Sequence, residues 1–185
     1  EDNIRIHPII IKGGGAVSAI PDDVRIEIGI RAKTIEGLEL ATKKVDRAMK
    51  AGAFAVGAKL SIISTSGYLP LKNDPELQRI NRDNLIALTG EKSVVDRGHD
   101  TWSSDSGDLS TIIPVALPVV SSASGQAHGK DYLVQDYPLT IITTAKAIAA
   151  TVVDLLSNKA QQALHVKNSF KPTFTKEQYL KTVRD

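Results

Sequence analysis

Strict alternation of apolar and charged residues in the segment DVRIEIGIRA restricts this part of the chain to an extended conformation. Apolar side chains at every second position, Val24, Ile26, Ile28 and Ile30, fall on one face of such a segment, and charged side chains lie on the other. The pattern predicts a half-buried β-strand. A strand is also predicted over residues 4–12, because β-branched residues there precede the turn former GGG.

Helices are predicted where capping residues precede apolar residues at helical spacing. Thr34 is the N-cap candidate for a helix over about 35–51, and Asp74 followed by Pro75 starts a helix that ends at Gly90. A last short helix is predicted after the capping box in the tail segment TFTKEQYL.

Two further apolar stretches, AKLSIIST and LSTIIPVALPVV, are predicted as strands, and the polar residues 91–111 are predicted as a loop. A glycine and two prolines in GYLPLKNDP interrupt the pattern after the first of these stretches. We therefore place a domain boundary near Gly67, with a compact α+β unit before it.

The longest apolar stretch, from Leu139 to Leu156, is predicted to be a buried helix of a soluble domain. It contains Lys146 and Asp154, which are both costly to place in lipid, so no membrane span is expected and a cytoplasmic location is favoured. The chain starts EDNIRIHP, without an initiator Met or a signal-like leader, so we expect a processed chain or a piece of a longer protein. Its 23 basic and 21 acidic residues are spread along the chain, which argues against nucleic acid as a partner.

Cysteine is absent, so any metal ion must be bound by His, Asp or Glu. The four histidines, His7, His99, His128 and His165, are not spaced as helical ligand pairs. The sequence alone therefore predicts no self-contained metal site, and a histidine on a strand, such as His7, is usually structural or exposed.

The segment WSSDSGDLS places Asp105 and Asp108 three residues apart, with small residues between them. Carboxylates in such a turn commonly accept hydrogen bonds from their own backbone. The alternative is that the turn lies in a cleft, where its hydroxyl and amide groups face a ligand.

Three segments, in the right order and spacing, resemble motifs of a family of zinc metallopeptidases and amidohydrolases that includes aminoacylase, glutamate carboxypeptidase and p-aminobenzoyl-glutamate hydrolase. RIHPIIIKGGGAVSAIPD resembles the family's Arg-x-His-Gly-Ile-Ile with its Gly-Gly and Asn-Val-Ile-Pro-Asp. SSDSGDLSTIIPV is similar to Ser-Ser/Thr-Asp-x-Gly-Asp-Leu/Val-Ser-x-x-x-Pro, and SGQAHGKDYLVQD is similar to Gly-x-x-x-His-Gly/Ser followed by an aromatic residue. The resemblance covers nearly the whole chain.

The resemblance implies an α/β fold in two parts. Residues 1–67 would be most of a small α+β lid that mediates homodimerisation and lacks its first helix, and residues 68–185 would be the C-terminal segment of an α/β catalytic domain. The implied activity is zinc-assisted hydrolysis of an amide bond in an N-acyl amino acid or small dipeptide. An N-terminal catalytic half would be the second partner.

The resemblance also implies roles for particular residues. His128 would be the last ligand of a dinuclear zinc site, and His7 would polarise the scissile carbonyl in the partner subunit's site. Arg31 would bind a substrate carboxylate, and Gly125 would let the backbone approach the substrate. The family's other zinc ligands belong before the lid, so this chain alone is expected to be inactive.

Two positions depart from the family's motifs, because Ser18 stands in place of Asn and Leu117 in place of a His found in close relatives. These changes and the missing ligands support a second hypothesis, a non-catalytic descendant that acts as a dimerisation or interaction module. In either case we expect exposed apolar surface on the helix over 141–155 and around Ile112.

Overall fold

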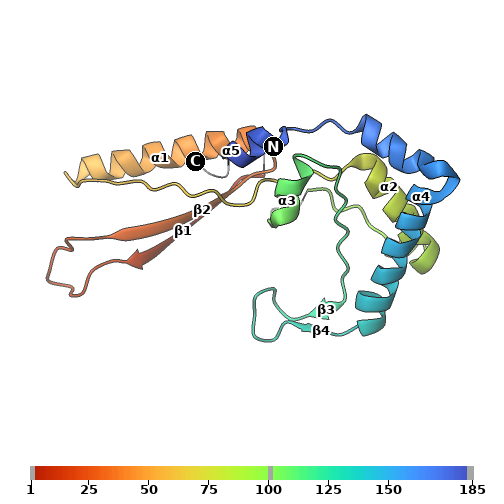
Figure 1. Ribbon diagram of the computed structural model, residues 1–185. Coiled ribbons are helices and arrows are strands. Elements are labelled where there is room, and N and C mark those ends of the chain that lie inside the picture. Colours follow the sequence, from red (N-terminus) through yellow and green to blue (C-terminus); the bar gives the residue numbers. More distant parts are fainter. Residues whose placement is uncertain (1–2, 100–101, 183–185) are drawn as a thin grey trace. The chain divides into compact units, whose positions relative to one another are not determined.

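The computed structural model describes residues 3–99 and 102–182, and the chain divides by its internal contacts into two compact units. Unit 1 comprises Glu1–Leu71 and Gly98–Gly107, and unit 2 comprises Lys72–Arg97 and Asp108–Asp185. Figure 1 labels the α-helices and strands of both units.

Unit 1 begins with a two-stranded antiparallel sheet (Figure 1). Strand β1 spans Arg5–Lys12 and strand β2 spans Arg25–Arg31, so both predicted strands are confirmed. Ile6 lies opposite Ile30, which puts the alternating apolar side chains of both strands on one face of the sheet. Ile28 and Ile30 on this face of β2 are half-buried, as the alternation predicts.

Helix α1, Ile35–Ala55, follows β2 and contacts it. The side-chain hydroxyl of Thr34 accepts a hydrogen bond from the backbone N–H of Gly37 at 3.0 Å, so the predicted N-cap is confirmed. The helix continues one turn beyond the predicted end near Ala51. Gly37 and Ala41 are its buried residues.

The strand predicted over residues 58–65 is wrong, because this stretch is irregular. Its apolar residues Leu60, Ile62 and Ile63 are 41%, 39% and 86% exposed, and no described strand pairs with the stretch. A strand needs a partner for its backbone N–H and C=O groups, and an apolar pattern alone does not supply one.

Unit 2 is built around two helices that pack against each other, α2 (Pro75–Thr89) and α4 (Thr144–Ser169). The predicted start of α2 is confirmed, because Oδ1 of Asp74 accepts a hydrogen bond from the backbone N–H of Leu77 at 2.9 Å. The helix ends at Gly90, whose φ of 85° favours glycine.

Shorter elements lie between these helices and after α4. Two of them lie in the segment that was predicted as a loop. The strand predicted over residues 109–120 is wrong, because its first two residues belong to α3 and the rest form turns and irregular chain. The short elements are the 3₁₀ helix η1 (Glu91–Ser93), α3 (Asp105–Ser110), the hairpin strands β3 (Ala123–Ser124) and β4 (Leu133–Val134), the π-helix η2 (Pro138–Thr143) and α5 (Lys176–Thr182).

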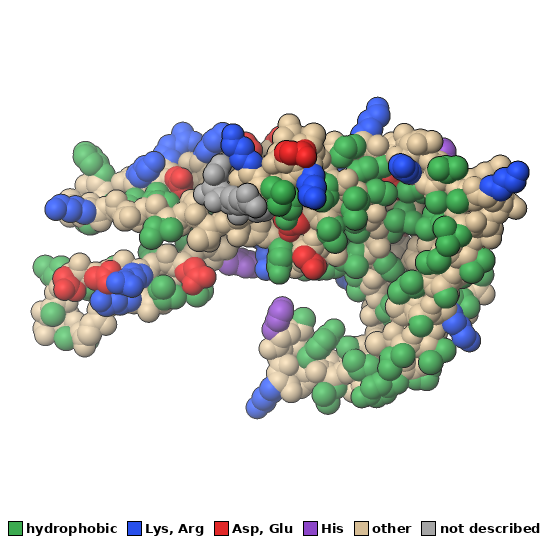
Figure 2. All heavy atoms as spheres, viewed as in Figure 1, with side chains coloured by type: hydrophobic (Ala, Val, Ile, Leu, Met, Phe, Trp, Pro, Cys, Tyr) green, Lys and Arg blue, Asp and Glu red, His purple; other side chains and the backbone are tan. Residues whose placement is uncertain are grey.

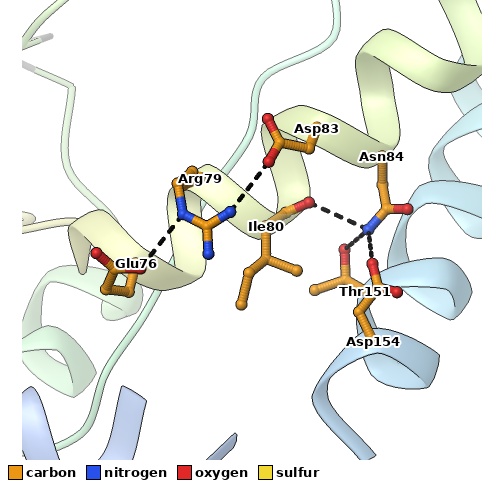
Figure 3. A network of polar contacts seen from close by, with 7 residues as sticks. All are labelled: Glu76, Arg79, Ile80, Asp83, Asn84, Thr151 and Asp154. Carbon is orange, nitrogen blue, oxygen red and sulfur yellow. Dashed lines mark hydrogen bonds and ion pairs between the residues drawn. The ribbon is translucent and has the colours of Figure 1, made fainter. Parts of the chain in front are cut away.

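A row of polar contacts joins α2 to α4, and Figure 3 shows the part around Asn84. Nδ2 of Asn84 lies 2.7 Å from Oδ2 of Asp154, and Nδ2 of Asn81 lies 3.2 Å from Oγ1 of Thr151. Asn81 and Thr151 are only 7% and 8% exposed, beside Ile80 at 3%. Because buried polar groups cost free energy unless they are hydrogen-bonded, these contacts favour one register of the two helices.

Helix α4 bends at residues 157–160, as the ribbon in Figure 1 shows. Asn158, Lys159 and Ala160 have φ angles of 49°, 58° and 58°, in the left-handed region that favours glycine. The bend follows Leu156, where the predicted helix ends.

The helix predicted to be buried is largely exposed, which confirms the exposed apolar surface expected over residues 141–155. Ile141, Val153 and Leu156 are 57%, 62% and 64% exposed, and Figure 2 shows hydrophobic side chains along α4. By length and composition the segment Pro138–Ser169 could cross a membrane, and 11% of its most apolar window is buried. One such helix is also common in soluble proteins, so it identifies neither class.

The tail of the chain folds back onto the end of α3 within unit 2. The carbonyl oxygen of Thr111 accepts hydrogen bonds from the backbone N–H groups of Thr173 and Phe174, at 2.8 and 3.1 Å. The predicted capping box is confirmed, because Thr175 and Gln178 each bond the other's backbone N–H, at 3.2 and 2.8 Å.

The described residues form a mixed structure of helices and two antiparallel two-stranded sheets. This mixture is compatible with the α+β class, and the predicted α/β fold in two parts, a lid and a catalytic segment, stays a prediction.

Candidate functional site

His7 and Arg31 lie on the same face of the β1–β2 sheet. His7 is directly opposite Gly29, and Arg5 is directly opposite Arg31. Arg5 precedes His7 by two residues on β1, so the side chains of Arg5, His7 and Arg31 lie on one face. The side chains of His7 and Arg31 are exposed. Two guanidinium groups and an imidazole on one face favour an anionic neighbour, because like charges opposite each other destabilise a sheet. Sequence reasoning missed Arg5, since only the strand register reveals it.

A small cavity of about 20 Å³ lies beside Arg31 within unit 1. Its lining includes the side chains of Tyr68, His99 and Trp102. A space of this size holds about one water molecule, so it is too small for a dipeptide. The cavity is therefore at most the edge of a binding site on unit 1.

Asp23 joins the two strands next to the long turn between them. Its Oδ2 lies 2.9 Å from Nζ of Lys12 and 2.9 Å from Nη2 of Arg25. Hydrogen bonds from Arg25 and then Lys12 hold the pKa of the Asp23 carboxyl below its usual value. Ser18 lies beyond this ion pair, in the exposed turn.

His128 lies in the turn of the β3–β4 hairpin, with an exposed side chain and a backbone φ of 65°. The left-handed region is uncommon for residues other than glycine. A backbone hydrogen bond of 2.7 Å from Gly129 N–H to the Gln126 carbonyl closes the turn around it. Such backbone strain persists where the surroundings fix it, and it concentrates at functional sites.

Gly125, at the base of the same turn, has a φ of 87°. A Cβ atom there would lie 2.6 Å from the carbonyl carbon of Asp131 and 2.9 Å from the backbone nitrogen of Tyr132. Only glycine fits where the two backbones cross so closely. This contact explains the glycine without a ligand, and its predicted role in substrate approach stays a prediction.

The carboxylates of the WSSDSGDLS segment differ in their surroundings. Asp105 is exposed, whereas Asp108 is 8% exposed and its Oδ1 accepts a hydrogen bond of 3.3 Å from the hydroxyl of Tyr179. Burial, and then the neighbouring Asp108, raise the pKa of Tyr179 above its usual value. Asp108 therefore attaches α5 to α3, which favours the structural interpretation of this residue.

Gly107 of the same segment belongs to unit 1 and packs against the backbone around Leu69 in that unit. A Cβ atom there would overlap the carbonyl oxygen of Leu69 and lie 3.3 Å from the backbone nitrogen of Leu71. This close approach explains why the motif requires glycine at this position. In unit 2, Leu117 is half-buried and its backbone N–H donates to Oδ1 of Asn73 at 3.0 Å.

A zinc site requires several His, Asp or Glu side chains close together. Within residues 3–99 and 102–182, no group of three or more His, Asp or Glu side chains could hold a metal ion. His128 fits as one zinc ligand, because its imidazole is exposed on a fixed turn, but a stable site needs three or four ligands. The described residues therefore do not fit a complete zinc site.

Sequence reasoning also missed the residues that attach the β3–β4 hairpin to the helix after it. The hydroxyl of Ser122, before β3, lies 2.6 Å from the hydroxyl of Thr140 in η2. Neither residue belongs to a recognisable motif, and no periodicity relates positions so far apart in the chain.

No family model matches the chain. Among curated proteins it is similar to the Xaa-Arg dipeptidases of Mus musculus and Homo sapiens, with 27% and 26% identity over 188 and 189 aligned residues. These alignments cover 96% and 97% of this chain and 43% of each relative. The chain thus spans less than half the length of these curated relatives.

A third relative is the N-acetyldiaminopimelate deacetylase of Leuconostoc mesenteroides, which is 32% identical over 84 residues. This alignment covers 45% of the chain and 21% of the relative. By their names, the three relatives are a pair of dipeptidases and a deacetylase. The chain is therefore similar, at low identity, to hydrolases of the peptidase and amidohydrolase kind.

Proposed function

We propose that this chain is the C-terminal portion of a dinuclear-zinc amidohydrolase that cleaves an amide bond in an N-acyl amino acid or small dipeptide. The single observation that carries the proposal is the conformation of His128. The histidine of the family motif is held in the left-handed region, on a turn whose backbone contacts fix it, with its imidazole exposed. The strain and the motif together make this histidine the best candidate for a ligand on the described part of unit 2.

The named activities of the relatives support the class of reaction. A dipeptidase cleaves a peptide bond, and a deacetylase that acts on an N-acetyl compound cleaves the amide bond of the acetyl group. When bound, zinc would polarise the amide carbonyl and supply an activated water molecule. We propose that the ligands besides His128 lie in an N-terminal catalytic half, and that this chain alone is inactive.

The residues of unit 1 would act on the substrate itself. An arginine binds a carboxylate through two parallel hydrogen bonds, so Arg31 suits the carboxylate of an amino acid, and Arg5 opposite it adds a second positive charge. An imidazole N–H of His7, on the same face, could donate a hydrogen bond to the oxyanion that forms during amide hydrolysis.

Dimerisation through unit 1 is part of the proposal. Strand β1 is exposed along its whole length, and within the described residues its outer edge has no partner strand. Open strand edges favour pairing with another chain, and a second copy of unit 1 provides a matching edge. His7 would then lie close to the partner subunit's site.

The test uses the product of the complete gene. We expect it to hydrolyse N-acetyl amino acids or Xaa-Arg dipeptides, to lose this activity with a chelator and to regain it with zinc. His128→Ala should lower zinc affinity and activity, whereas His165→Ala, which changes another exposed histidine of unit 2, should lower neither. Equal zinc affinity of the two variants would contradict the proposal.

The second candidate function is a non-catalytic dimerisation or interaction module. The apolar side chain of Leu117 and the exposed apolar residues of β1, such as Ile10 at 70%, favour it. In this case the complete gene product would dimerise but cleave no amide in the presence of zinc. Ile10→Lys would shift the dimer to a monomer in analytical ultracentrifugation.

A further inference from the structure

The hairpin that carries His128 has little support of its own. Its strands pair over only two positions, Ala123 with Val134 and Ser124 with Leu133. An isolated two-stranded hairpin is marginally stable in water, and this ladder is shorter than most. The direction of the hairpin therefore depends on the contacts at its base.

The backbone of Ser122 forms the first of these contacts. Its carbonyl oxygen accepts hydrogen bonds from the backbone N–H groups of Gln135 and Asp136, at 2.8 and 3.1 Å. Ser122 is only 9% exposed, so these bonds are shielded from water. They close the hairpin where both strands leave it.

The hydroxyl of Thr140 forms the second contact. It lies 2.6 Å from Oγ of Ser122 and 2.6 Å from the carbonyl oxygen of Asp136. A hydroxyl has one proton, so Thr140 can donate to the carbonyl and accept from Ser122 at the same time. In addition, Oδ1 of Asp136 accepts a hydrogen bond of 2.8 Å from the backbone N–H of Leu139, in the first turn of η2.

We propose that Ser122 and Thr140 are positioning residues that set the direction of the His128 hairpin relative to η2 and α4. The inference rests on the proposed role of His128 as a zinc ligand. The assigned role of Ser122 and Thr140 is to hold the hairpin, through the hydrogen bonds that Thr140 makes with Ser122 and Asp136. They act by joining the base of the hairpin to the first turn of the long helix, so that His128 is presented in one direction.

The effect on zinc follows from how strictly a metal site depends on the placement of its ligands. Loss of a residue that orients a ligand typically lowers metal affinity by roughly 10–100-fold. Thr140→Val keeps the size of the side chain and removes the hydroxyl from both contacts. We therefore expect roughly 10-fold weaker zinc binding for this variant.

The experiment measures zinc affinity of the complete gene product by competition with a chromophoric chelator. Thr140→Ser keeps the hydroxyl and should restore most of the affinity, and Ser122→Ala, which leaves the Thr140 bond to the Asp136 carbonyl, should have a smaller effect than Thr140→Val. The matched control is Thr42→Val on α1, which removes a comparable hydroxyl bond of 2.9 Å to the Leu38 carbonyl. We expect no change in zinc affinity for this control.

Amide hydrogen exchange supplies a readout that does not depend on metal. Thr140→Val should speed exchange at Gln135 and Asp136, while helix content and melting temperature stay close to those of Thr42→Val. Unchanged zinc affinity in Thr140→Val, with weaker binding in His128→Ala, would overturn this inference and leave the proposed function standing. Unchanged affinity in His128→Ala would overturn both.

Discussion

Nδ2 of Asn84 on α2 lies 2.7 Å from Oδ2 of Asp154 on α4, and the same nitrogen lies 3.1 Å from the carbonyl oxygen of Ile80 one turn earlier (Figure 3). The nitrogen of a side-chain amide carries two protons, so one Asn84 side chain can serve a carboxylate on the facing helix and a carbonyl of its own helix. Asn84 thereby links the two long helices of unit 2.

Asn84→Ala is expected to destabilise the protein by about 1–3 kcal/mol, because it leaves the partly buried Asp154 carboxylate without its amide donor. Chemical denaturation followed by circular dichroism would measure the change. Arg79→Ala on the same helix is the control. Its ion pairs with Glu76 and Asp83 are exposed, so its loss should cost only about 0.5 kcal/mol. Equal losses in the two variants would contradict this account of the polar contacts.

Gly125→Ala is expected to destabilise the β3–β4 hairpin by about 2 kcal/mol or more, because a Cβ atom would overlap the backbone of Asp131 at a φ that disfavours alanine. Gly67→Ala makes the same chemical change where no atom lies within 4 Å, and should be close to neutral. Differential scanning calorimetry and amide exchange at Tyr132 would compare them. A neutral Gly125→Ala would show that the turn can relax.

Two substitutions at His128 separate backbone strain from imidazole chemistry. Both His128→Gly and His128→Ala remove the imidazole, but only glycine adopts a φ of 65° without strain. The glycine variant should therefore be more stable than the alanine variant by about 1 kcal/mol. Both should lose zinc affinity to the same extent. If the alanine variant were the more stable one, His128 would not be strained.

The ion pairs of Asp23 should weaken in acid. Hydrogen bonds from Arg25 and Lys12 lower the pKa of this carboxyl in the folded chain. The ionised carboxylate therefore stabilises the folded chain relative to the unfolded one. The bonds to Lys12 and Arg25 are therefore complete well above pH 3.8, the ordinary value, and are lost as the pH falls below it. NMR titration of the β1–β2 turn should give a midpoint below 3.8, and Asp23→Asn should abolish that transition. A midpoint above 3.8 would contradict the ion pairs.

Local sequence signals predicted the elements whose stability is local. The alternation in β2, the caps at Thr34 and Asp74, and the capping box at Thr175 are all seen in the structure. Each depends on residues within a few positions of one another. The strand expected over 58–65 failed because pairing requires a second strand, and no local pattern reports whether one is present.

The candidate site could be predicted only where it carries a motif. The histidines at 7 and 128 follow from the motifs that contain them, but the left-handed conformation of His128 does not. The contact between Ser122 and Thr140 joins two ordinary residues, 18 positions apart. Arg5 opposite Arg31 depends on the register of two strands, which the turn length sets.

The bend in α4 limits what its apolar face can do. Three left-handed residues divide the segment from Pro138 to Ser169 into two rods, and the first, ending at Leu156, is about 29 Å long at 1.5 Å per residue. That length matches the hydrocarbon thickness of a bilayer, about 30 Å. However, one side of this rod already holds α2 through Asn81 and Asn84. Lipid would have to surround both helices, including the charged side chains of α2, so a protein surface is the more favourable environment for this face.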